Sequence, residues 1–201
     1  MTKAEQDRLL RRSGTDISDA LAHVQTIIDE VKKTGDTALR AYTATYDGAD
    51  LAGLPLRVTD EEFEQACREL SEDIKKALDF AIENITTVHK NQKPKPLEMV
   101  QVQQGLFAGE RITPIDSAGL YVPRGRGNFP SMLYMLAVPA VVAGVPRISI
   151  VTPPGERGAI DPACLYAAQQ CGVTEVFRVG GAHAVAALAF GTESIAPAVK
   201  I

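Results

Sequence analysis

The sequence predicts an α/β fold in which a helical α+β segment precedes an incomplete Rossmann-like domain of order βαβαβα. Candidate strands at residues 119–122, 147–151 and 175–179 recur about every 28 residues. Runs that favour helices, at 131–143, 162–171 and 182–190, lie between and after them. This spacing is typical of βαβ units, which require parallel strands and right-handed crossovers. We therefore expect one segment at 1–118 and a Rossmann-like domain at 119–201 that lacks its C-terminal part.

The first ninety residues carry amphipathic helix patterns. One helix has an apolar face that ends before Gly35 and comprises Ile17, Leu21, Val24, Ile28 and Val31. Thr59 and Glu62 form a capping box, and Ser71 begins the next helix, so two further core-facing helices are expected. The proline-rich residues 90–96 form a turn, and two strands, 98–104 and 106–112, are expected around Gly105.

Two helices in the second segment have clear boundaries or an unusual composition. Asp161 as N-cap, Pro162 at the first helical position and Gly172 after the end define the middle helix. The longest apolar run, residues 129–145, contains Pro130, Pro139 and Gly144, and its helix is too short to span a bilayer. It predicts a helix buried on all sides.

Composition excludes several classes of function. The chain has 201 residues, 45% of them hydrophobic, and a formal net charge of −4, so we expect neither nucleic acid nor membrane as a partner. Cys67, Cys164 and Cys171 form no CxxC pair, and each is expected to be a buried small hydrophobe. Residues 1–12 have no apolar core of a signal peptide, so a cytoplasmic protein is expected.

Two glycine turns follow candidate strands. At Gly125-Arg126-Gly127, Pro130 stands where a dinucleotide fingerprint has its third glycine, and Thr152-Pro153-Pro154 replaces its acidic residue. A helix N-terminus beside Arg124 and Arg126 could still bind a phosphate or sulfonate. Alternatively, the glycines only permit a tight turn.

The second glycine turn, Gly180-Gly181, places His183 in the first turn of a helix. The helix dipole disfavours a cation there, so a neutral, hydrogen-bonding histidine is expected. His23 and His89 are expected to be surface or partly buried structural residues. Because no motif has metal-ligand spacing, we expect no metal site and no catalytic residue on this chain.

Several motifs together resemble the histidinol dehydrogenase family. They are Gly119-Leu120-Tyr121-Val122-Pro123, Val138-Pro139-Ala140, Thr152-Pro153-Pro154, Val179-Gly180-Gly181-Ala182 and the run from Ala186 to Thr192. The resemblance extends upstream through residues 35–39, Tyr42 and residues 89–92. The resemblance covers nearly the whole of this chain. In an enzyme of that family it corresponds to only about the first half of the sequence.

The resemblance implies a zinc-dependent, NAD-linked oxidation of the small amino alcohol L-histidinol to L-histidine by a homodimer with incomplete Rossmann-like domains. Tyr121 and His183 match positions at which the family binds NAD, although the family has glutamine where this chain has His183. The zinc ligands, the acid and the base belong to the second half of the family's sequence, so this chain alone is expected to be inactive.

Two alternatives stay open. Pro123-Arg124-Gly125-Arg126 stands where the family usually has Pro-Gly-Gly, and its two arginines would suit the anionic group of a second candidate, a relative that oxidises another small polyol such as a sulfonated propanediol. The second alternative is a non-catalytic module that binds a nucleotide or a partner.

Overall fold

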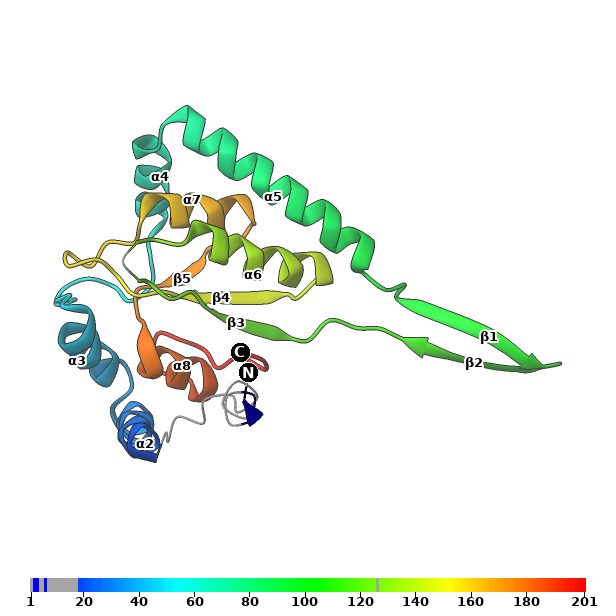
Figure 1. Ribbon diagram of the computed structural model, residues 1–201, viewed down its shortest axis with the longest axis horizontal. Coiled ribbons are helices and arrows are strands. Elements are labelled where there is room, and N and C mark those ends of the chain that lie inside the picture. Colours follow the sequence, from blue (N-terminus) through cyan, green and yellow to red (C-terminus); the bar gives the residue numbers. More distant parts are fainter. Residues whose placement is uncertain (1, 4–5, 7–17, 126) are drawn as a thin grey trace.

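A computed structural model of the chain describes residues 2–3, 6, 18–125 and 127–201. The expectations that involve Ile17 and Arg126 lie outside these residues. Figure 1 shows a small central sheet with helices on both faces and a long hairpin that projects away from them.

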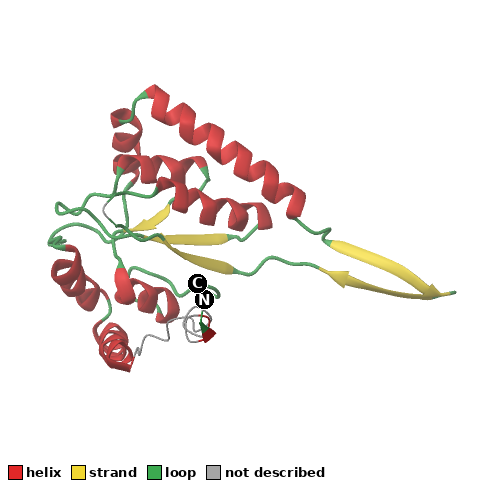
Figure 2. Ribbon diagram, in the orientation of Figure 1, coloured by secondary structure: helices red, strands yellow, loops and turns green. Residues whose placement is uncertain are grey.

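The central sheet is parallel, with strand order β3-β4-β5 (Figure 2). Its strands are β3 (Ser117–Tyr121), β4 (Arg147–Val151) and β5 (Glu175–Phe177), connected by α6 (Pro130–Ala143) and α7 (Pro162–Gln170). Helix α8 (Gly181–Phe190) follows β5. The expected βαβαβα order is confirmed, and its apolar strands are buried because helices cover both faces.

Both edges of this sheet are extended by other segments. Leu56 and Val58 flank an antiparallel bridge from Arg57 to Phe177, and the amide of Val58 donates to the Val176 carbonyl at 2.8 Å. At the other edge Lys200 forms a parallel bridge to Ala118. The C-terminal residues therefore lie beside β3.

On one face, α4 (Asp60–Glu69) and α5 (Glu72–Gln92) pack against α6 and α7 (Figure 1). The capping box at α4 is confirmed: the Glu62 amide donates to Thr59 Oγ1, and the Thr59 amide donates to Glu62 Oε2. Ser71 caps α5, and Asp161 caps α7 through the amides of Ala163 and Cys164. These local signals fix where three helices begin.

On the opposite face, α2 (Ser18–Thr34) and α3 (Asp36–Asp47) pack against α8. Gly35, with a φ of 53°, separates α2 from α3. Helices that precede residue 118 thus share both hydrophobic cores with the βα units that follow it. The domain division near residue 118 stays a prediction.

The hairpin of β1 (Leu97–Gln103) and β2 (Leu106–Arg111) confirms the two strands expected around Gly105. All residues of both strands are exposed. Along one face lie Leu97, Met99 and Phe107, because their positions alternate with Glu98 and Glu110. An isolated two-stranded hairpin is marginally stable in water, so this arm has an uncovered apolar face.

Four expectations about burial are wrong. Helix α6 buries Leu133, Ala137 and Val138, but Met135 is 56% exposed and a second side of the helix is open. In α2, Ile27 rather than Leu21 is buried, and in α5 the ends of the apolar stripe are exposed. The apolar stripes of α2 and α5 extend beyond the part of each helix that neighbouring helices cover. Cys164 and Cys171 are buried as expected, whereas Cys67 is half-buried.

Candidate functional site

The carboxyl ends of β3, β4 and β5 meet at one edge of the sheet, where open α/β sheets bind their ligands. Three loops, 122–129, 152–161 and 178–180, leave the sheet there. Both glycine turns and Tyr121 belong to this edge. We take this end of the sheet, formed by the carboxyl ends of its strands, as the candidate site and call it the candidate edge. It differs from the two lateral edges along β3 and β5.

Two side-chain hydrogen bonds at the candidate edge hold the loop of the first glycine turn. Arg124 Nη1 donates to the Pro154 carbonyl at 2.8 Å, and Asn128 Nδ2 donates to Asp161 Oδ2 at 2.7 Å. The space between these groups has a volume of about 10 Å3, room for little more than a water molecule. Arg124 thus connects the loops after β3 and β4, a role that its position in the sequence did not indicate.

The second glycine turn allows two loops to approach closely. A Cβ on Gly180 would lie 2.3 Å from Pro153 Cγ, so glycine is required there for the loops after β4 and β5 to pack. Gly181 has a φ of 60°, a left-handed conformation that favours glycine. Loop packing therefore explains the glycine at position 180, and backbone conformation explains the one at position 181. The turn also leaves the first amides of α8 exposed.

His183 lies in the first turn of α8 and is 1% exposed. Its Nε2 lies 3.3 Å from the hydroxyl of Thr43, which is also fully buried. Its Nδ1 has no hydrogen-bond partner among the described residues. Burial lowers the pKa of His183 from 6.5 to about 4, so the ring is neutral at pH 7. The expected neutrality is confirmed, with burial as its cause rather than the helix dipole.

Two stacked tyrosines of α3 lie beside His183. Tyr42 and Tyr46 have ring centroids 5.7 Å apart, and each contacts the imidazole of His183 at 5.6 and 6.3 Å respectively. The Tyr42 hydroxyl donates to Glu30, and the Tyr46 hydroxyl bonds His23 at 2.8 Å. His23 is an exposed structural residue, as expected. The sequence did not reveal this cluster, because its members come from three separate helices.

Tyr121, the other predicted cofactor residue, ends β3 and is partly buried against the core that α8 shares with α2 and α3. It keeps some exposed surface at the candidate edge, whereas His183 is covered. The assignment of both residues to the cofactor stays a prediction.

Sequence reasoning also missed a buried arginine. Arg178, just after β5, is 1% exposed; its Nη1 donates to the Gly158 carbonyl at 2.8 Å and its Nη2 to Glu62 Oε2 at 2.5 Å. Burial alone would raise the pKa of Glu62, but the bonds from Arg178 and Thr59 bring it below its usual value. The only sequence signal was a charge at the end of an apolar strand.

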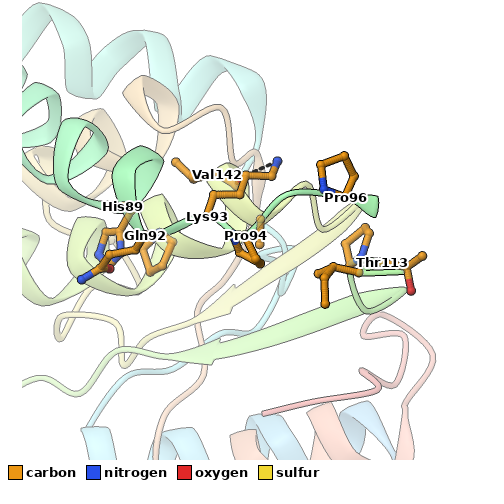
Figure 3. A pocket seen from close by; sticks show the side chains of 11 residues that line it. His89, Gln92, Lys93, Pro94, Pro96, Thr113 and Val142 are labelled. Atoms are coloured by element: carbon orange, nitrogen blue, oxygen red, sulfur yellow. Dashed lines mark hydrogen bonds between the residues drawn. The ribbon is translucent and has the colours of Figure 1, made fainter. Parts of the chain in front are cut away.

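The larger hollows lie away from this edge. Figure 3 shows a cavity of about 350 Å3 between the end of α5, the base of the hairpin and the end of α6. Lys93 Nζ donates to the Val142 carbonyl across it at 2.7 Å, and His89 is half-buried there, as expected of a structural histidine. The cavity adjoins the C-terminal end of α6, far from the glycine turns at the carboxyl ends of the strands. Its lining is mostly apolar, with the side chains of His89, Gln92, Lys93 and Thr113 as its polar members.

In the part of the chain that the structure describes, no three His, Cys, Asp or Glu side chains gather as metal ligands. None of the described helices combines the length and apolarity that crossing a membrane requires. Burial raises the pKa of Cys164 to about 12 and that of Cys171 to about 11, so both thiols stay protonated at neutral pH.

Comparison with known proteins identifies the family that has this arrangement. A sequence profile described as histidinol dehydrogenase matches residues 10–201. The chain belongs to the histidinol dehydrogenase family. Members of this family are oxidoreductases, and the chain corresponds to their N-terminal part.

Individual relatives agree with this assignment. The chain is 47% identical to a "Histidinol dehydrogenase homolog" of Rhizobium meliloti, over 98% of this chain and 43% of that protein. It is 41% identical to a "Histidinol dehydrogenase" of Synechocystis sp., over 100% of this chain and 46% of the relative. The chain therefore spans less than half the length of these histidinol dehydrogenase relatives.

A solved structure shows the same fold. A crystal structure of histidinol dehydrogenase from Elizabethkingia anophelis superposes with a TM-score of 0.89 at 32% identity. The superposition covers 98% of this chain and 45% of that one. The parallel sheet with helices on both faces is thus an arrangement shared with a histidinol dehydrogenase.

Proposed function

We propose that this chain is the NAD-binding part of a histidinol dehydrogenase that oxidises L-histidinol to L-histidine in the cytoplasm as a homodimer. The observation that carries the proposal is the buried Nδ1 of His183 at the glycine turn of α8, which has no hydrogen-bond partner among the residues that the structure describes. A buried polar atom without a partner is costly, and here it lies beside free amides at a sheet edge that suits ligands.

The residues of this edge fit NAD in three ways. The turn at Gly180-Gly181 gives a ligand access to backbone amides at a helix N-terminus, which attracts phosphate oxygens. Tyr121 offers a flat ring with some exposed surface. His183 is neutral, so it can form a hydrogen bond without repelling or attracting the charge of the cofactor. Bound NAD would accept a hydride from the alcohol carbon.

Zinc does not fit the residues that the structure describes here. No cluster of three candidate ligands exists among them, and the buried cysteines are held as neutral thiols by their surroundings. We therefore assign the zinc ligands and the acid and base to the part of the family's sequence beyond this chain.

This assignment predicts that the 201-residue chain has no dehydrogenase activity by itself. Its residues would bind and orient the cofactor, and the groups that remove protons from the alcohol are assigned to the second half of the family's sequence. NADH formation would be followed with purified chain, L-histidinol, NAD and added zinc. A rate above the no-protein control would contradict the proposal that this chain binds the cofactor while the second half of the family's sequence supplies the zinc ligands, the acid and the base.

Binding is the direct test of the proposal. Isothermal titration of NAD into the chain should give a saturable 1:1 isotherm, weakened in Tyr121→Ala. Arg68→Ala serves as the control, because Arg68 is exposed on α4 and pairs with Glu64. Absence of binding would refute the NAD-binding role. The alternative of an enzyme for an anionic diol is tested by titrating a sulfonated propanediol into the chain. Saturable binding of this diol that is lost in Arg124→Ala would favour that alternative.

A further inference from the structure

Thr43 holds an unusual position for a threonine within a helix. The hydroxyls of Thr26, Thr34, Thr45 and Thr87 each donate to the carbonyl four residues earlier. Thr43 Oγ1, by contrast, has His183 Nε2 as its partner at 3.3 Å and no bond to its own helix among the described contacts. Its hydroxyl is therefore directed away from α3 and toward α8.

The proton on this contact can be placed by counting donors and acceptors. A neutral imidazole has one N–H donor and one acceptor nitrogen, and a hydroxyl has one donor. If Nε2 carried the ring proton, the Thr43 hydroxyl would accept it. Both the hydroxyl proton and Nδ1 would then be buried without partners. If the hydroxyl donates to Nε2, only the Nδ1–H lacks a partner.

Each arrangement leaves one buried donor unmatched, the hydroxyl proton in the first and the Nδ1–H in the second. The first also leaves Nδ1 without any bond, whereas the second leaves only spare lone pairs on a hydroxyl oxygen that is already bonded, so the second arrangement is favoured. The low pKa of His183 excludes the doubly protonated ring at neutral pH. The count of donors and acceptors therefore favours the ring proton on Nδ1.

The Nδ1 atom is also the one that faces the turn. A Cβ built on Gly181 would lie 3.4 Å from both Nδ1 and Cε1 of His183, so of the two ring nitrogens Nδ1 is the one beside the turn, whereas Nε2 contacts Thr43. The N–H of the ring is thereby presented beside the first amides of α8. All of these groups are hydrogen-bond donors, so they suit an acceptor such as a carbonyl or phosphate oxygen.

We infer that Thr43 is a positioning residue that fixes His183 as its Nδ1–H tautomer, so that the ring donates a hydrogen bond to an acceptor oxygen of NAD at the start of α8. The stacked rings of Tyr42 and Tyr46 hold the imidazole plane beside this bond. The inference rests on the proposed NAD site. The tautomer itself can be measured without NAD.

The first measurement is a long-range proton–nitrogen correlation spectrum of the chain labelled with nitrogen-15 in histidine, at pH 7. His183 is identified by the signal that disappears in His183→Gln. We expect its Nδ1 to resonate as a protonated nitrogen and its Nε2 as an unprotonated one. Thr43→Ser keeps the hydroxyl and should keep this pattern, whereas Thr43→Val should move the two nitrogen signals toward each other. The reverse assignment in the wild-type chain, or an unchanged spectrum in Thr43→Val, overturns the inference.

The second measurement is the NAD dissociation constant of the same variants. Loss of one hydrogen bond in Thr43→Val should weaken NAD binding about three- to ten-fold. Thr45→Val is the matched control, because Thr45 is exposed on the same helix and bonds to Ala41; it should leave binding unchanged. In the His183→Gln background, which has no tautomer to fix, Thr43→Val should have no further effect.

The outcomes separate the inference from the proposal on which it rests. If the wild-type chain does not bind NAD, the proposed function fails while the tautomer spectrum still tests Thr43. If His183→Gln changes NAD affinity and Thr43→Val does not, the NAD site stands and the role of Thr43 is refuted.

Discussion

The guanidinium of Arg178 and the carboxylate of Glu62, 116 positions apart, meet beneath the loop that follows β4. Glu62 also accepts from the Thr59 amide as part of the capping box. One carboxylate therefore links the start of α4 to the end of β5, and Arg178 extends this link to the Gly158 carbonyl. The network fixes three segments around the candidate edge.

Arg178→Met should destabilise the chain by about 2–3 kcal/mol, because it leaves the partly buried Glu62 without its cation and removes the bond to Gly158. Urea unfolding followed by circular dichroism measures this. Arg68→Met is the control: its pair with Glu64 is exposed and should contribute under about 1 kcal/mol. Adding Glu62→Gln to Arg178→Met should recover part of the loss. A loss no larger than that of the control would contradict the structural role of Arg178.

Stability should fall as the pH drops from about 6.5 to about 4, because His183 has a pKa of about 4 in the folded chain and 6.5 as its ordinary value. In that window the unfolded chain takes up a proton that the folded chain does not. Between pH 7 and pH 5 the loss from this group is about 2 kcal/mol. Urea titrations of wild type and His183→Gln at both pH values isolate it. The prediction fails if the two proteins lose stability equally.

Gly180→Ala should destabilise the chain by at least about 1–3 kcal/mol, since its Cβ would overlap Pro153 and force the loops apart. Gly127→Ala is the matched control in the other turn, where an added Cβ meets nothing within 4 Å and φ is not positive. It should be neutral or slightly stabilising. Thermal unfolding of both variants tests the pair. Equal midpoints would show that Gly180 is not required for loop packing.

The chain should self-associate through the apolar face of its hairpin. Met99 and Phe107 are 53% and 57% exposed and project to the same side of β1 and β2. Replacing both with lysine should weaken association at least about ten-fold, because each buries apolar surface when paired. Sedimentation velocity across a concentration series measures this. Phe80→Lys, on α5 and 68% exposed, is the control. A concentration-independent monomer would rule out this role for the hairpin.

Local sequence signals predicted most of the fold. The capping residues Thr59, Ser71 and Asp161 and the turn residue Gly105 each act within a few residues, and the strands and helices that follow recur about every 28 residues. The exposure of α6 could not be predicted in this way. Its sequence is apolar all round, and a pattern does not tell which side another part of the protein covers.

The candidate site was predicted only in part. The two glycine turns and Tyr121 follow from strand ends, which the sequence reveals. The bonds from Thr43 to His183 and from Arg178 to Glu62 join residues more than a hundred positions apart, and their side chains have no periodic signal. Only folding brings these residues together, so sequence reasoning could place His183 on a helix but not find its partner.

The location of NAD on the chain tests the central claim most directly. Amide proton–nitrogen spectra of the labelled chain, recorded during titration with NAD, report which residues the cofactor approaches. We expect the largest shifts at residues 179–183 and at Tyr121, saturating together with one dissociation constant. Shifts centred on the cavity around Lys93 and Val142, or no saturable shifts at all, would contradict the assignment of NAD to the carboxyl edge of the sheet.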